Sequence, residues 1–138
     1  SLCATVTVPL VSEMAKKKKA APPGVVRASE FQLVDADGKL RALLLMSANG
    51  DPSLHLLDKK QCSRVVIELT GNGQPLVSLV DQTGRPALDL RISEHGPGIR
   101  FCDSAGMPGL IVQLFPDGSR AVVALNQAGE TVWDKQWK

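Results

Sequence analysis

The chain has few aromatic residues: three Phe, two Trp and no Tyr among 138 residues. Exposed aromatic rings are the usual stacking platforms in sites for sugars and single-stranded nucleic acid. Trp133 and Trp137 both lie near the C-terminus, so no such platform recurs along the chain. The composition therefore counts against a repeated site of either kind.

Long apolar runs are also missing. The longest clusters, such as Leu43–Met46 and Val65–Ile67, fall far short of the roughly 18–20 apolar residues that a membrane-spanning helix needs. The sequence therefore predicts no membrane span in this chain. It opens Ser1-Leu2-Cys3 without Met, as after removal of a secretory signal or anchor, and an expression boundary would look the same.

A strong net charge is absent too. The formal net charge is +2, and the only charges in residues 1–24 are Lys16–Lys19 and Glu13. From Val25 onward, twelve Lys and Arg face thirteen Asp and Glu, so this region has no basic field for nucleic acid. We expect no nucleic-acid partner.

Three cysteines, Cys3, Cys62 and Cys102, leave at least one unpaired within the chain. One interpretation is a disulfide bond between Cys62 and Cys102. The favoured interpretation is that the cysteines are small, buried apolar residues. No CxxC pair or Cys/His cluster indicates a metal site, and we expect no cofactor.

What the chain does have is a repeat. A D-x-x-G turn returns every 22–23 residues, and its copies are 35–38, 58–61, 81–84, 103–106 and 126–129. A second series of turns runs half a period out of step, at 48–50, 71–73, 94–96 and 116–118. A fixed period of this length indicates one supersecondary unit copied along the chain.

The segments between the turns are short and rich in β-branched and apolar residues, without a helical period, so the chain is predicted to be all-β. We expect about ten strands in five repeats, at 25–34, 39–47, 54–57, 64–70, 75–80, 87–93, 98–102, 109–115, 120–125 and 131–137.

Residues 88–92 alternate between apolar and charged, whereas Val65–Ile67 and Leu110–Val112 are apolar on both faces. Some strands are therefore expected to be covered twice, by a closed barrel, a solenoid or neighbouring subunits. An antiparallel meander of hairpins, curled or barrel-like, competes with a two-sided β-solenoid. The turn chemistry favours hairpins slightly, and either arrangement leaves open edges.

The turn aspartates are candidate calcium ligands. Asp35-x-Asp37-Gly38 resembles the start of a calcium loop, but Met46 stands where the loop needs its final Glu. We interpret these aspartates as turn-forming residues. No metal-binding residue is predicted.

Other candidate residues carry little catalytic signal. His55 and His95 lie in different repeats without a nucleophile motif, and the spacing of Glu68, Asp89 and Glu94 does not call for a carboxylate pair. We predict no catalytic residue. The seven scattered arginines are read as solubilising or ion-paired, with an Arg-lined groove as the alternative; they are Arg27, Arg41, Arg64, Arg85, Arg91, Arg100 and Arg120. Trp133 and Trp137, four residues apart, share one face of the last strand. They are expected to cap the open core of the last repeat, with docking of a partner as the alternative.

Residues 31–42, FQLVDADGKLRA, resemble the unit of short bacterial β-repeat proteins of the form F-x-L-x-D-x-x-G-x-x-R-A. The resemblance covers about residues 25–135. Gln61 departs from it in a glycine slot, and Asn126 departs from it in an aspartate slot. It implies a bacterial protein that is secreted or attached to the cell surface, and it carries no functional residues across.

The sequence thus predicts a 1–24 segment, comprising a short β-stretch and a basic, Pro-rich linker, followed by a 25–138 β-repeat domain. The expected function is a non-enzymatic structural module that self-associates into a homo-oligomer, with residues 1–13 supplying a strand to another subunit. The alternative is a binding module for a polysaccharide or other extracellular polymer. A small β-barrel enzyme is the third and least favoured hypothesis.

Overall fold

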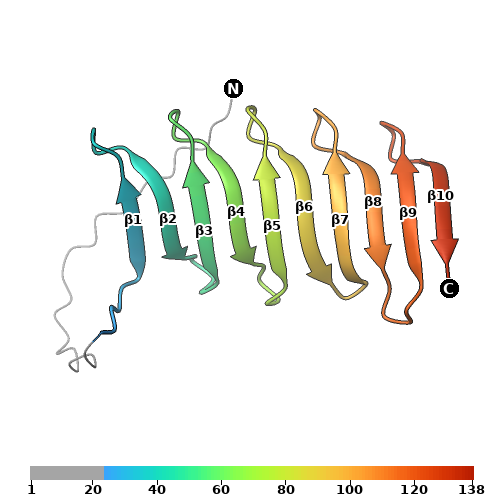
Figure 1. Ribbon diagram of the computed structural model, residues 1–138, viewed down its shortest axis with the longest axis horizontal. Coiled ribbons are helices and arrows are strands. Elements are labelled where there is room, and N and C mark those ends of the chain that lie inside the picture. The colour runs from blue at the N-terminus through green and yellow to red at the C-terminus, as the bar shows by residue number, and fades with distance from the viewer. Residues whose placement is uncertain (1–23) are drawn as a thin grey trace.

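The computed structural model describes residues 24–138, which form a single ten-stranded antiparallel sheet with the strands in sequence order (Figure 1). The strands are β1 (Glu30–Val34), β2 (Leu40–Met46), β3 (Pro52–Leu57), β4 (Ser63–Leu69), β5 (Pro75–Val80), β6 (Pro86–Ser93), β7 (Gly96–Cys102), β8 (Pro108–Leu114), β9 (Arg120–Leu125) and β10 (Thr131–Trp137).

The all-β fold and the hairpin meander predicted from the turns are confirmed, because every strand pairs with its neighbour in sequence. The sheet neither closes into a barrel nor coils into a solenoid, so β1 and β10 are open edges. The first strand was predicted too long. It begins at Glu30, opposite Leu45 near the end of β2, so residues 25–29 have almost no ladder to join despite the apolar Val25 and Val26.

The Asp turns all lie along one end of the sheet, and the second series lies along the other (Figure 1). In the first copy, the Asp35 carboxylate accepts hydrogen bonds from the backbone N–H groups of Asp37 and Lys39 at 3.1 and 3.0 Å. Gly38 has a φ of +75° and donates its N–H to the Asp35 carbonyl. The strand register shifts beside this turn, between Leu33 and Val34. A type I turn followed by a left-handed residue and a bulge produces this pattern, so the D-x-x-G motif is a hairpin signal.

Gln61 occupies the glycine slot of the second copy and has a φ of +64°, the one positive φ of a non-glycine residue among the described residues. A residue with a Cβ is strained in this conformation by about 1–2 kcal/mol relative to glycine. The turn still closes, because Gln61 donates its N–H to the Asp58 carbonyl at 3.1 Å. Its side-chain amide also donates to the Leu40 carbonyl at 2.9 Å.

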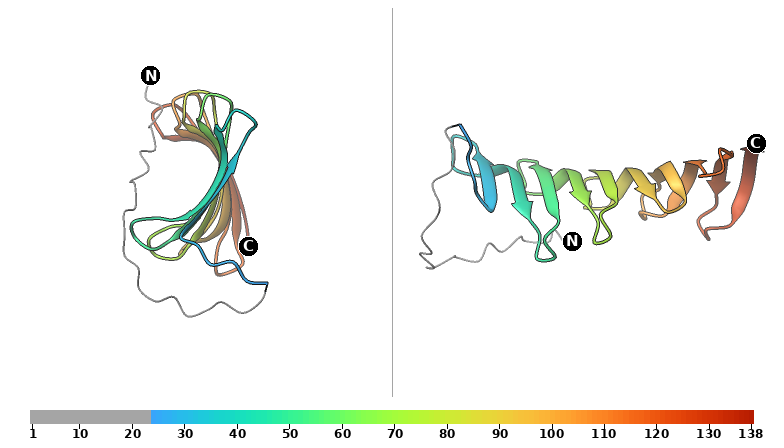
Figure 2. Two further views of the ribbon diagram at one scale, coloured as in Figure 1. Left: turned by 90° about the vertical axis from the view of Figure 1, so that its left-hand side faces the viewer. Right: turned by 90° about the horizontal axis from the view of Figure 1, so that it is seen from below.

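The described residues form one layer. Viewed end-on, the strands superimpose into a crescent, and the view from below shows no second layer of strands or helices (Figure 2). Only three apolar residues in this part of the chain are buried: Leu43, Cys62 and Ala121. Within the described residues, a sheet of this length therefore has almost no core of its own.

Candidate functional site

The strand register places nearly every large apolar side chain on one side of the sheet, which we call the apolar face. Side chains alternate between the two sides of a strand, so residues paired across the ladder share a face. One row across all ten strands is Leu33, Ala42, Leu56, Val65, Leu79, Leu88, Phe101, Leu110, Ala124 and Trp133. The next row is Phe31, Leu44, Leu54, Ile67, Val77, Leu90, Ile99, Val112, Val122 and Lys135.

The apolar face is open to solvent within the described chain. Fifteen of the 21 large apolar side chains that are exposed lie on it: Phe31, Leu33, Leu44, Met46, Leu56, Ile67, Leu69, Leu79, Leu90, Ile92, Phe101, Val112, Leu114, Trp133 and Trp137. Leu90, in the sixth of ten strands, is still 43% exposed. Monomeric proteins rarely expose an apolar patch of this extent, and such patches mark interaction surfaces.

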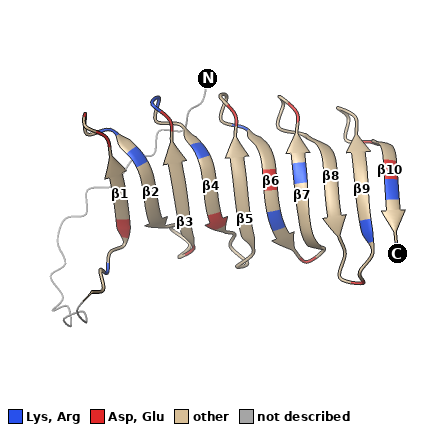
Figure 3. Cartoon of the chain, in the orientation of Figure 1, with Lys and Arg blue, Asp and Glu red and all other residues tan. Residues whose placement is uncertain are grey.

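Charge is almost absent from this face. Its two charged strand residues are Arg120 and Lys135, both at the β9–β10 end. Charged residues gather at the turns and at a few strand positions (Figure 3). The acidic strand residues all belong to the opposite side, called the mixed face; they are Glu30, Glu68, Asp89 and Asp134.

The apolar face also has a groove of about 570 Å³, lined by residues such as Val77, Leu90 and Val112.

The mixed face is crowded enough to bury its own polar groups. Ser53, Ser78 and Asp89 are buried there, beside Leu43 and Ala121. The mixed face therefore buries several of its own side chains within the described residues, whereas the large side chains of the apolar face stay exposed.

The buried carboxylate of Asp89 is paired on the mixed face. It accepts a hydrogen bond from the Ser78 hydroxyl at 2.7 Å and forms an ion pair with Arg100 on β7. The structure does not join Asp89 to Glu68 or Glu94 by any hydrogen bond among the described residues.

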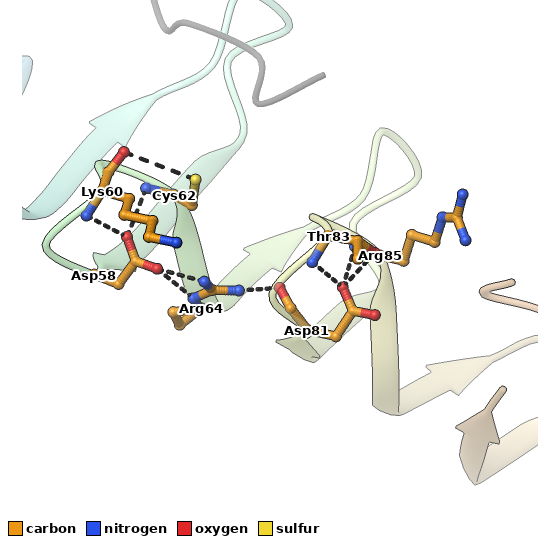
Figure 4. A network of polar contacts seen from close by, with 7 residues as sticks. All are labelled: Asp58, Lys60, Cys62, Arg64, Asp81, Thr83 and Arg85. Carbon is orange, nitrogen blue, oxygen red and sulfur yellow. Dashed lines mark hydrogen bonds and ion pairs between the residues drawn. The ribbon is translucent and has the colours of Figure 1, made fainter. Parts of the chain in front are cut away.

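The Asp turns are linked to one another by arginine side chains. Arg64 forms an ion pair with Asp58 in its own repeat, and its guanidinium also donates to the backbone carbonyl of Asp81 in the next (Figure 4). Arg85 continues the series by donating to the Ser104 carbonyl at 2.6 Å. The predicted pairing of arginines with acidic residues thus holds for Arg64 and Arg100, while Arg85 binds a carbonyl group instead.

The turn aspartates use their carboxylates within the turns. The backbone N–H of Cys62, together with Arg64, lowers the pKa of Asp58. The backbone N–H of Arg85 and the Thr83 hydroxyl lower the pKa of Asp81. Residues 24–138 contain no group of three His, Cys, Asp or Glu side chains placed to hold a metal ion. The geometry supports the turn-forming role of these aspartates.

His55 makes one contact that could not be predicted from the sequence. Its Nδ1 lies 3.1 Å from the Ser63 hydroxyl, because Ser63 begins the strand beside β3. Only the strand register, which depends on the bulge at Leu56 and Leu57, reveals this neighbour. Among the described residues no carboxylate bonds to the ring, so the third member of a catalytic triad is not in place. His95 is exposed, with its Nε2 3.7 Å from Glu94.

Cys102 is a free thiol, so the Cys62–Cys102 bridge considered from the sequence is wrong. Burial raises the pKa of the Cys102 thiol, and the nearby Asp89 carboxylate adds to this, so the thiol is less reactive than usual. Cys62 is buried but takes part in a disulfide bond, so the favoured interpretation of it as an unpaired, buried apolar residue is wrong. Cys3 lies outside the described residues.

Trp133 and Trp137 both project from the apolar face of β10, as their spacing predicted. They are 53% and 43% exposed, so they do not close off the end of a core. Throughout residues 24–138, no helix is long and apolar enough to cross a membrane. No protein-family model matches the chain, and no curated protein is significantly similar to it in sequence.

Proposed function

We propose that the protein is a non-enzymatic assembly module in which the apolar face of one copy packs against that of a second copy. The observation that carries the proposal is the exposure of fifteen large apolar side chains on a single face. Burial of apolar surface is the main favourable term in protein association, and a single-layer sheet has little other means of burying it.

The size of the face suits a second copy. Ten strands about 4.8 Å apart, each about six residues long at about 3.3 Å per residue, span roughly 43 by 20 Å. That face of about 900 Å² is close to the roughly 800 Å² that each partner buries in a standard stable interface. A two-fold pairing covers both copies with one self-complementary surface, because each copy supplies the same patch.

Charge also favours this partner. No strand acid lies on the apolar face, so burying its centre desolvates no carboxylate. Arg120 and Lys135 lie at one end of the face. There they stay at the rim of an aligned sandwich, where they remain hydrated.

Face packing is preferred here to edge-to-edge extension of the sheet. The edge strand β10 carries Asp134 and Lys135 at its centre, and charges on an edge strand, above all Lys, discourage further strand pairing. Strand exchange by residues 1–13 remains a hypothesis, because those residues lie outside the described part of the chain. We also propose a secreted or surface location, supported by the resemblance of residues 31–42 to bacterial β-repeat units.

The test is the mass of the native particle for the full chain and for two variants, measured by light scattering. Leu90→Glu places a charge at the centre of the apolar face and is expected to give monomers. Gln136→Glu places the same charge on the mixed face of β10 and is expected to leave the oligomer intact. An oligomer that survives Leu90→Glu would contradict packing through this face. Circular dichroism confirms that each variant keeps its β-structure.

A further inference from the structure

A polar pocket of about 330 Å³ lies at the end of the sheet opposite the Asp turns. It is lined by the β4–β5 loop, the end of β6, and the β6–β7 turn. Its polar side chains include Asn72, Gln74, Arg91, Glu94 and His95. This pocket is independent of the proposed packing of the apolar face, because its hydrogen-bonding groups belong to the loops and the mixed face.

Among the side chains that line this pocket, Arg91 is notable because its guanidinium has no bonded partner in the described part of the chain. Its side chain is on the mixed face between Leu76 and Gly98, and it is exposed. Within residues 24–138 its guanidinium has no hydrogen bond and no ion pair, whereas Arg64 and Arg85 both bind turn carbonyl groups. Arg91 therefore has all its donors available to a ligand.

The pocket also contains a second guanidinium, which is fixed in place. Arg100 is held by its ion pair with the buried Asp89, and its Nε is buried without a hydrogen-bond partner. Because that Nε is shielded from solvent, Arg100 contributes a fixed pocket wall, and Arg91 is the arginine whose donors a ligand can reach.

The wall beside the β6–β7 turn is braced. Gln113 lies over Gly98, where a Cβ would come within 2.6 Å of its side-chain oxygen. The Gln113 amide donates to the carbonyls of His95 and Pro97 at 2.9 and 3.1 Å. The turn that carries Glu94 and His95 is thus tied to β8, which keeps the pocket in shape without a ligand.

The arginine is specific to this repeat. Equivalent positions on β2, β4, β8 and β10 carry Leu45, Glu68, Gln113 and Gln136, in the same cross-strand row as Arg91. The neighbouring pocket between the β2–β3 and β4–β5 loops contains Glu68 and Asp51 instead, so it is acidic. Since the repeat folds with Gln or Leu at this position, the fold itself does not need Arg91.

We propose that this pocket binds the carboxylate of an acidic sugar, such as a uronate unit in an extracellular polysaccharide. A guanidinium pairs with a planar carboxylate through two parallel hydrogen bonds. Asn72, Gln74 and His95 provide donors for ring hydroxyls, and Glu94 provides an acceptor. Leu76, which pairs with Arg91 on the mixed face, gives an apolar surface for the C–H face of the ring. Glu94 disfavours a dianion such as phosphate more than a monoanion, which points to the carboxylate.

The test is a calorimetric or NMR titration of the full chain with oligogalacturonate. Neutral galacto-oligosaccharide and inorganic phosphate serve as the comparison ligands. We expect oligogalacturonate to bind and the two comparison ligands to bind at least about tenfold more weakly, since each lacks either the carboxylate or the sugar ring. Binding of phosphate as tight as that of the uronate would overturn the sugar assignment, and no uronate binding would overturn the site.

The key variant is Arg91→Gln, which copies the residue found at the equivalent position on β8 and β10 and so keeps the fold. It is expected to weaken uronate binding about tenfold or more. The matched control is Arg120→Gln, which removes another arginine without a bonded partner, from the opposite face. Equal loss in both variants would indicate only a general charge effect and would refute the site. Arg91→Gln should leave the particle mass unchanged, so the binding and assembly proposals can fail separately.

Discussion

The guanidinium of Arg64 bonds to the backbone carbonyl of Asp81, the first residue of the next Asp turn. The same side chain holds the Asp58 carboxylate through an Nε–Oδ2 hydrogen bond of 2.7 Å. Two turns separated by a full repeat are therefore joined through one residue. Such links matter in a single-layer sheet, where each repeat contacts only its neighbours.

Replacing Arg64 by Ala is expected to lower the free energy of unfolding by about 1 kcal/mol, chiefly through the lost hydrogen bond to Asp81. The ion pair with Asp58 adds little, because both side chains are about a quarter exposed and water screens them. Chemical denaturation at one protein concentration measures the change, since assembly makes stability depend on concentration. Arg120→Ala, which breaks no bond, is the control; an equal loss there would contradict the role of Arg64.

Gln61→Gly is expected to stabilise the protein by about 0.5–1 kcal/mol, because glycine relieves the positive φ while the bond to Leu40 is lost. The converse change, Gly84→Ala, places a Cβ at a φ of +85° in the next turn and should destabilise by about 1 kcal/mol. Thermal unfolding of both variants shows the two signs. A loss of stability in Gln61→Gly would mean that the Leu40 bond outweighs the backbone strain.

Asp89→Ala is expected to destabilise the sheet by about 2–3 kcal/mol, because it leaves the Arg100 guanidinium partly buried without its counter-ion. Ser78→Ala removes one hydrogen bond to the carboxylate and should cost about 1.5 kcal/mol. Urea denaturation curves give both values. If the two variants lost equal stability, the ion pair with Arg100 would contribute nothing beyond the serine bond.

Acid should weaken the turns. The pKa values of Asp58, Asp81 and Asp117 lie below the usual aspartate value in the folded protein, so the unfolded chain takes up protons first as the pH falls. Their contribution is complete above the ordinary pKa near 4 and is lost as the pH falls through the lowered values. Thermal midpoints measured from pH 6 to pH 2 should therefore fall below about pH 4.

Asp81→Asn should reduce this pH dependence while the turn still forms. Asn126 shows that the amide is compatible, since its Oδ1 accepts the N–H groups of Ala128 and Glu130 at 2.9 and 3.0 Å. Midpoints of Asp81→Asn that fall as steeply as those of the unmodified chain would assign the acid sensitivity to other groups.

The sequence was informative about the fold because its signals are local. Asp35 and Gly38 define a turn within four residues, and the constant spacing of such turns placed the strands to within a few residues, except at residues 25–29. Closure could not be predicted, because it depends on whether β1 meets β10 and no local pattern specifies that.

The candidate surface was harder to predict. Because residues 65–67 are all apolar, the sequence predicts that both faces of this strand are buried. Only the strand register shows that Ile67 lies on an exposed apolar face. The bulge beside each Asp turn shifts the alternation, so a face cannot be followed through a turn by counting residues. The Arg64–Asp81 and His55–Ser63 contacts depend on the same register.

The most direct test is the mass of the unmodified particle over a range of concentrations, by native mass spectrometry or light scattering. If copies of the chain cover one another's apolar faces, the particle has at least twice the 14.7 kDa of one chain and dissociates on dilution. A folded particle of 14.7 kDa that stays monomeric at high micromolar concentration would contradict the account.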